Sequence, residues 1–214
     1  MMIYPSVEQF IRQAVAQTAI AEPRQHLLYD AAETLHKQLS EPGDTPLLLC
    51  VCTHNSRRSH FARVWAEIMQ YHLFDGERPF RVESAGTEAT ACNPRTAASL
   101  ERAGLVITPD PTDSRATPEN PVYVCHYSDE QKPLRLWSKT IDDEAISQPL
   151  TAIMTCSDAD QNCPFIPGAK ARIRMTFEDP KSSDGTPEEA RTYDARSAQI
   201  AAEMHFMFNA LAQK

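Results

Sequence analysis

The fold is decided by residues 47–59, which read LLLCVCTHNSRRS. The first five of them, Leu47 to Val51, form a continuous apolar run that follows the turn-forming segment 41–46. Such a run is typical of a central strand that is buried on both faces. A polar loop follows from Cys52 to Ser59, and from about Ser59 onward the apolar residues recur at helical spacing. The stretch therefore predicts a strand, a loop and a helix in succession.

Further strands and helices are predicted on the carboxyl side of this stretch. Residues 80–83 (Phe-Arg-Val-Glu) predict a second strand, Asn93-Pro94 is typical of a helix start, and Gly104 is typical of its end. This alternation indicates an α/β fold with a parallel sheet covered by helices. We predict a four-stranded parallel sheet flanked by helices, with strands near 47–51, 80–83, 150–155 and 170–177 and a final helix over about 187–211.

Two parts of the chain lie outside this pattern. Residues 1–44 carry two helical stripes of apolar residues, and we expect them to form an N-terminal helical extension of the α/β domain, which spans 45–214. Residues 122–125 and 134–137 are strand-like and flank a polar turn. They predict a β-hairpin inserted at about 118–138.

The composition limits the class of partner. The 214 residues carry a formal net charge of -8, which argues against nucleic acid and anionic membrane surfaces as partners. A small anion site needs only a few local donors and is compatible with this charge. The first residues lack a signal-peptide pattern, no apolar stretch has membrane-spanning length, and the six cysteines indicate reduced thiols. We expect a cytoplasmic protein.

The loop after the first strand has the composition of an anion cradle. It holds a cysteine, five residues, an arginine and a serine, and it ends at a helix start, where several backbone N–H groups point to one place. These donors and the helix dipole favour a thiolate at Cys52. The arginine can bind two anion oxygens with its planar fork. The candidate oxyanion-binding residues are Thr53, His54, Asn55, Ser56, Arg57, Arg58 and Ser59.

A C-x5-R match alone occurs often by chance, but three further segments accompany this one. Residues 51–59 resemble the signature loop of the low-molecular-weight protein tyrosine phosphatases and of the thioredoxin-coupled arsenate reductases. Glu83-Ser84-Ala85-Gly86-Thr87 and the later Asn93-Pro94 are similar to the second strand and following helix of both. Residues 155–164 resemble the redox segment of the reductases, and residues 177–180 resemble the Asp-Pro loop that both share.

The resemblance implies a role for each reactive residue. Cys52 is the nucleophile, Arg58 and the loop amides bind phosphate or arsenate, and Asp179 is the acid–base residue. In a reductase, Cys156 then attacks Cys52, Cys163 attacks Cys156, and thioredoxin reopens the final disulfide. The six residues between the two cysteines fit a mobile loop that closes this ring by rearranging. Neither a cofactor nor a metal is implied.

Other functions stay open at this point. A low-molecular-weight phosphatase would hydrolyse phosphotyrosine through a thiophosphate and needs only Cys52, Arg58 and Asp179. A regulatory oxyanion-binding module without activity is a third class. Cys156 and Cys163 could also be buried thiols, although the polar residues between them argue against a core. A zinc site would require four ligands, which the neighbourhood of this pair does not supply.

The chain also departs from the family pattern. His54 stands where a glycine is usual, and Arg57 replaces a frequent cysteine. Arg63 stands where potassium-binding reductases carry a glutamate, and Ser138-Lys139 lies near another ligand position. We hypothesise that a side-chain charge occupies the place of the potassium ion.

Overall fold

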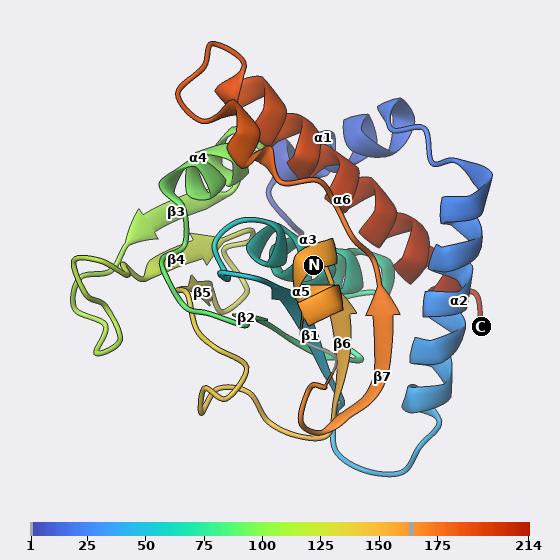
Figure 1. The fold of residues 1–214 in the computed structure, drawn as a ribbon. Coiled ribbons are helices and arrows are strands. Elements are labelled where there is room, and N and C mark those ends of the chain that lie inside the picture. Colours follow the sequence, from blue (N-terminus) through green and yellow to red (C-terminus); the bar gives the residue numbers. More distant parts are fainter. Residues whose placement is uncertain (1, 163–164) are drawn as a thin grey trace.

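A computed structural model describes residues 2–162 and 165–214. Its main sheet has four parallel strands in the order β2-β1-β6-β7 (Figure 1), so the predicted four-stranded parallel sheet is confirmed. The bounds are β1 (Leu47–Cys52), β2 (Arg81–Gly86), β6 (Leu150–Met154) and β7 (Ala169–Arg174).

The observed strand ends differ from the expected ones by up to three residues. β2 continues to Gly86, whereas the predicted strand ended at residue 83. β7 ends at Arg174, three residues earlier than predicted. Beyond that point the Phe177 N–H still donates to the Thr155 carbonyl at 3.0 Å, but the ladder with β6 has ended.

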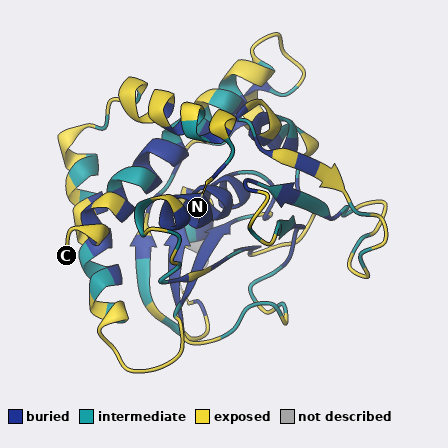
Figure 2. Ribbon diagram, turned by 180° about the vertical axis from the view of Figure 1, so that it is seen from behind, coloured by how far each residue is buried: buried dark blue, intermediate teal, exposed yellow. Residues whose placement is uncertain are grey.

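Helices cover one face of the main sheet. Leu48 and Cys50 of β1 face the large core that includes α3 (Arg58–Leu73), α4 (Pro94–Arg102) and α6 (Glu189–Ala212). In Figure 2 the strands β1 and β6 and the helix α3 carry the colour of buried residues, while the outward sides of the peripheral helices are exposed. Asn93 begins α4 as predicted, because its side-chain oxygen accepts the Arg95 N–H at 2.9 Å.

The other face of the sheet packs on a smaller cluster. Leu47, Leu49 and Val51 contact this cluster, which also contains Ala159 of the short helix α5 (Ser157–Asn162). Successive strand residues point to opposite faces, so a strand with apolar layers on both sides has to be apolar throughout. This explains the unbroken run from Leu47 to Val51.

The N-terminal segment folds as two helices, α1 (Pro5–Gln17) and α2 (Glu22–Leu39). Figure 1 shows α1 beside the upper part of α6 and α2 beside its lower part. Val7 of α1 and Leu28 of α2 are buried in the same core as α3 and α6. The two helices thus occupy the predicted extension and share the main core. The boundary between residues 44 and 45 stays a prediction.

The inserted segment forms a second sheet. β4 (Tyr123–His126) and β5 (Leu134–Leu136) make the predicted antiparallel hairpin, and β3 (Val106–Pro109) pairs with β4 to give the order β3-β4-β5. The sequence did not predict β3, because this four-residue strand ends on a proline and is mostly exposed. Within the described ranges, no helix has both the length and the apolar character needed to cross a membrane.

Gly86 controls how closely β2 approaches the loop after β1. Cys52 and Gly86 are partners in the β1–β2 ladder, so the loop begins beside this glycine. A Cβ atom on Gly86 would lie 2.6 Å from the Thr53 carbonyl oxygen and 2.7 Å from the Asn55 nitrogen. These neighbours are backbone atoms and cannot move aside without displacing the loop.

We predict that Gly86→Ala lowers the free energy of unfolding by about 2 kcal/mol, because the added methyl group forces loop backbone apart. Urea unfolding measures the change. Gly43→Ala is the comparison, because a Cβ at Gly43 meets no atom within 4 Å and any loss there comes from its φ of 146°. A Gly86→Ala protein as stable as the wild type would contradict the close approach.

Candidate active site

Cys52 is the last residue of β1, and its side chain is held at the start of α3. Its Sγ lies 3.1 Å from the Ser59 hydroxyl, and the same hydroxyl accepts a bond from Asn55 Nδ2 at 2.8 Å. Asn55 Oδ1 in turn accepts the Lys139 N–H at 3.0 Å. Asn55 is fully buried and has a φ of 44°. The sharp turn of the loop therefore lies at Asn55, and the usual glycine position, His54, carries an exposed ring 3.6 Å from Glu88.

The carbonyl groups of the loop are bound by neighbouring segments. The Thr53 carbonyl accepts from the Glu88 N–H at 2.8 Å, the His54 carbonyl from the Ser138 hydroxyl at 2.8 Å, and the Ser56 carbonyl from the Asn93 N–H at 3.0 Å. The backbone N–H groups of residues 53–57 donate to no acceptor in the part of the chain that the structure describes. Anchored carbonyls and unused amides are what an anion cradle requires.

Arg58 joins this loop to the segment after β7. Its Nη1 donates to the Phe177 carbonyl at 3.0 Å, and its Nη2 donates to Asp179 Oδ2 at 2.6 Å. The buried Nε has no hydrogen-bond partner within the described residues. Asp179 Oδ1 also accepts the Lys181 N–H at 3.1 Å, which caps the 3-10 helix η1 (Pro180–Ser183). Residues from two distant parts of the sequence thus meet at the predicted site.

Cys156 lies two residues after the end of β6, the strand beside β1. It is fully buried, its Sγ lies 3.5 Å from Thr53 Oγ1, and the same sulfur accepts the Ala159 N–H at 3.3 Å. Cys52 and Cys156 belong to one apolar cluster. The expected mobile loop after Cys156 begins as helix α5, and Cys163 lies outside the described residues.

Helix α5 is attached to β7 by charge. Asp160 is nearly buried and accepts from Arg172 Nε at 2.9 Å, and Arg174 pairs with its second oxygen. A rearrangement that brings the segment after Cys156 toward the loop therefore has to disturb these ion pairs.

The remaining described cysteines are ordinary core residues. Burial raises the pKa of the Cys92 and Cys125 thiols to about 12, and it raises that of Cys50 further. Their thiolate forms are therefore scarce at neutral pH. For Cys50 this agrees with the prediction that the strand from Leu47 to Val51 is buried on both faces.

A buried charge cluster lies behind the loop. Glu83 of β2 accepts from Arg63 Nη2 at 2.9 Å, and Lys139 Nζ lies 3.1 Å from its second oxygen. The ammonium also lies 3.7 Å from the centre of the Trp137 ring. Burial and the nearby Arg63 lower the pKa of Lys139 to about 8, despite the attraction of Glu83. One carboxylate thus faces two cations.

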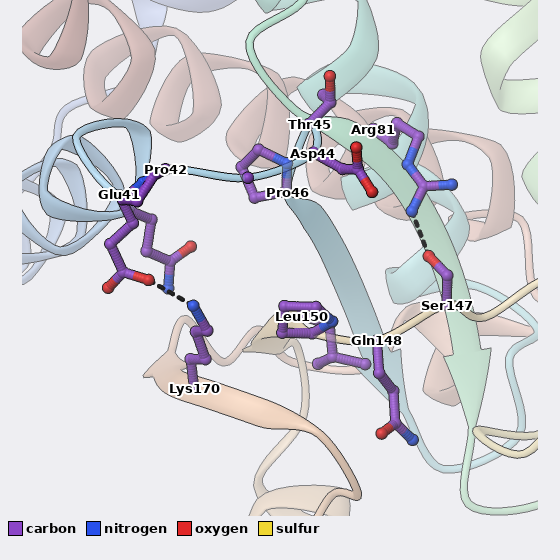
Figure 3. A pocket seen from close by; sticks show the side chains of 13 residues that line it. Glu41, Pro42, Asp44, Thr45, Pro46, Arg81, Ser147, Gln148, Leu150 and Lys170 are labelled. Atoms are coloured by element: carbon purple, nitrogen blue, oxygen red, sulfur yellow. Dashed lines mark hydrogen bonds and ion pairs between the residues drawn. The ribbon is translucent and has the colours of Figure 1, made fainter.

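A cavity of about 660 Å³ lies elsewhere. Figure 3 shows it at the amino ends of the strands, between the segment 41–46 and Leu150, where Arg81 pairs with Ser147 and Glu41 with Lys170. Cys52 is at the opposite end of β1, so this cavity is separate from the reactive residues. Among the residues described, no cluster of three or more His, Cys, Asp or Glu side chains is placed to hold a metal ion.

Comparison with known proteins shows that the chain is similar to arsenate reductases. No protein-family model matches it. It is 30% identical over 139 residues to an arsenate reductase of Bacillus licheniformis, covering 65% of this chain and 77% of that protein. It is 27% identical over 146 residues to an arsenate reductase of Bacillus subtilis, covering 68% and 82%.

The solved structures that are similar include a low molecular weight protein tyrosine phosphatase from T. tengcongensis, with a TM-score of 0.49, 14% identity, and coverage of 76% of this chain and 97% of that one. The relationship to the reductases rests on the sequence match, which extends over most of the Bacillus licheniformis protein. The chain is an enzyme that belongs to the arsenate reductase family.

Proposed function

We propose that this enzyme reduces arsenate to arsenite, with Cys52 as nucleophile and a cysteine relay that thioredoxin recharges. The observation that carries this proposal is the position of Cys156. Its thiol lies beside the oxyanion loop, 3.5 Å from Thr53 Oγ1, at the end of the strand next to the one that ends at Cys52. A phosphatase has no use for a second thiol at this place.

In the proposed mechanism the oxyanion binds to the amides of residues 53–57 and to Arg58. The unpartnered Nε and the short contact to Asp179 support this role, because the same guanidinium can turn its fork to an incoming anion. Binding would replace the bond from Arg58 to Asp179 and free the carboxyl group to deliver a proton.

The first chemical step is an attack of the Cys52 thiolate on arsenic. A sulfur–arsenic bond forms, one arsenic–oxygen bond breaks, and the departing oxygen leaves as water with a proton from Asp179. Ser59 donates to the sulfur when it carries negative charge, consistent with the 3.1 Å contact between them. Arsenic stays at oxidation state five in this step.

Reduction takes place in the second step. The Cys156 thiolate attacks Cys52 Sγ, a disulfide forms, and the electron pair of the sulfur–arsenic bond remains on arsenic, which leaves as arsenite. Cys163 then attacks Cys156 and releases Cys52 as thiolate. The two electrons that thioredoxin supplies to the Cys156–Cys163 disulfide complete the cycle.

Phosphotyrosine hydrolysis is the second candidate, because Cys52, Arg58 and Asp179 are together and water can cleave a thiophosphate without another sulfur. The deciding experiment measures arsenate-dependent NADPH oxidation with thioredoxin and its reductase, beside hydrolysis of p-nitrophenyl phosphate. Turnover in the second assay alone would support the phosphatase function instead.

We predict that Cys163→Ser abolishes thioredoxin-coupled arsenate turnover and leaves aryl phosphate hydrolysis within about twofold, because only the reductase needs the third sulfur. Cys52→Ser should abolish both activities, since a serine hydroxyl is hardly ionised at neutral pH. Cys125→Ser, a change at a buried thiol of the second sheet, is the control and should retain both. Arsenate turnover by Cys163→Ser with thioredoxin as sole donor would refute the relay.

Asp179→Asn should lower kcat for p-nitrophenyl phosphate by about a hundredfold or more, because the amide cannot deliver a proton. Glu178→Gln is the matched control: its carboxylate is almost fully exposed and pairs with Arg196 at 3.4 Å. Steady-state kinetics over pH 5–8 measures both. Equal losses in the two variants would argue against Asp179 as the proton donor.

We also propose that Lys139, together with Arg63, provides the positive charge that other members of the family take from potassium. The ammonium is nearly fully buried at Glu83, and the Lys139 backbone binds Asn55 of the loop. The lowering of its pKa from 10.5 to about 8 corresponds to roughly 3 kcal/mol against the charged form. The folded protein keeps the Lys139 ammonium buried although burial disfavours its charge. A functional role for this charge would explain why the cost is tolerated.

This cost predicts a pH dependence. Below about pH 8 the folded and unfolded chains both carry a charged Lys139, and the full burial cost is present. Between about 8 and 10.5 the folded protein releases the proton first, so the wild type gains stability relative to Lys139→Met. We expect a relative gain of about 2 kcal/mol between pH 7 and 9.5, measured by urea unfolding with a reductant. Lys170→Met, at a half-exposed lysine, should show no such trend. A pH-independent difference for Lys139→Met would contradict the buried charge.

A further inference from the structure

Two adjacent arginines hold the two ends of one segment. Arg58 binds the Phe177 carbonyl and the Asp179 carboxylate, as described above, while Arg57 Nη2 donates to Asp184 Oδ2 at 3.1 Å. Residues 177–184, which contain the proposed proton donor, are therefore attached to the oxyanion loop at both ends. We call this stretch the acid segment.

The contact at Asp184 is part of a closed ring of hydrogen bonds. Arg57 Nε donates to the Tyr193 hydroxyl at 2.6 Å, and that hydroxyl donates to Asp184 Oδ1 at 2.8 Å. Tyr193 is fully buried on α6, and the Arg57 side chain is 12% exposed. Both oxygens of Asp184 and two nitrogens of Arg57 are thus used. The ring connects the loop, the acid segment and α6.

The ring keeps its protonation pattern over a wide pH range. Burial raises the pKa of Tyr193 to about 12, with the bond to Asp184 acting in the same direction, so the hydroxyl stays a donor at neutral pH. Burial opposes the charge on Arg57, but Tyr193, Asp179 and Asp184 outweigh it and raise the pKa of this guanidinium. From α4, Arg95 faces the same carboxylate at 3.8 Å and pairs with Glu189 at 2.7 Å.

A bound anion would affect the contacts of the two arginines differently. An oxyanion over Cys52 competes for the fork of Arg58, which then gives up its hold on Asp179. Arg57 already uses Nε and Nη2 on residues outside the loop. Its hold on Asp184 does not depend on the fork of Arg58, so one end of the acid segment stays attached.

We infer that Arg57, Tyr193 and Asp184 form a clamp that keeps the acid segment over the oxyanion loop while Arg58 transfers to the anion. Arg57 is thus a positioning residue, and its side chain acts through Asp179. This inference rests on the proposed function, since it assigns the purpose of the clamp to proton delivery at the same site.

Hydrogen exchange tests the clamp without any turnover. Asp184→Asn removes the carboxylate charge that pairs with Arg57, and Tyr193→Phe removes the hydroxyl that bonds to both Arg57 and Asp184. Both substitutions keep the side-chain shape. We expect the amides of the acid segment to exchange at least tenfold faster in both variants than in the wild type, and faster still with saturating inorganic phosphate. Asp194→Asn, at the next residue of α6, is the matched control: it breaks the 2.7 Å pair with Arg102, and within the described residues Asp194 hydrogen-bonds to Ser99 and Arg102 of α4. Exchange at the wild-type rate in both variants, or an equal increase in Asp194→Asn, would overturn the clamp.

A double-mutant cycle tests whether the clamp acts through Asp179. With p-nitrophenyl phosphate, Asp184→Asn should lower kcat about tenfold in the wild-type background and less than twofold in the Asp179→Asn background. The inhibition constant of inorganic phosphate should change less than twofold. Equal losses of kcat in both backgrounds, or a tenfold weaker phosphate inhibition, would show that the residues act in another way, for example as direct ligands of the anion.

The clamp and the proposed function are tested by different experiments, and either can be refuted without the other. The thioredoxin-coupled assay on the wild type decides whether the enzyme reduces arsenate. The exchange experiment decides whether the clamp exists, whichever substrate the enzyme turns over.

Discussion

The pairing of β1 with β2 on one side and β6 on the other determines where each reactive group lies. Because all three strands are parallel, their carboxyl ends meet at one edge of the sheet, which is where ligands of open α/β sheets bind. Cys52 ends the central strand, Gly86 ends one neighbour, and Cys156 follows the other. A change of one residue in either register would turn these groups toward the wrong face of the sheet.

The loop at this edge is held by its neighbours more than by its own residues. Three of its carbonyl groups are bound by segments that follow β2, and its turn at Asn55 is fixed by a bond from the Lys139 backbone. Asparagine tolerates positive φ better than most residues, which explains how the loop forms without a glycine at position 54. The unused amides are the consequence of this external support.

The charged side chains at the candidate site form two groups. Arg57 and Arg58 connect the loop to residues 177–184, whereas Arg63 and Lys139 pair with Glu83 in the interior. The overall charge of the chain is negative, so the positive charge of these side chains is local, and it is weakly screened where they are buried. A small anion is therefore compatible with an acidic protein.

Much of this arrangement could be predicted from local sequence. The apolar run at Leu47–Val51, the loop that follows it and the helix start at Asn93-Pro94 are properties of neighbouring residues, and the four-stranded sheet followed from them. The third strand of the small sheet was not predicted, since its stability depends on pairing with β4. The position of Cys163 remains a prediction.

The sequence by itself determined the candidate reactive residues and the α/β fold, because strand and helix periodicity and the loop composition are local signals. Only the tertiary structure decided what each residue contacts. The ring of Arg57, Asp184 and Tyr193 joins positions more than 120 residues apart, and the pairing of Lys139 with Glu83 joins two separate segments. No local pattern marks such partners, since they are selected by the folding of distant segments into one core and by the need to pair charges buried there.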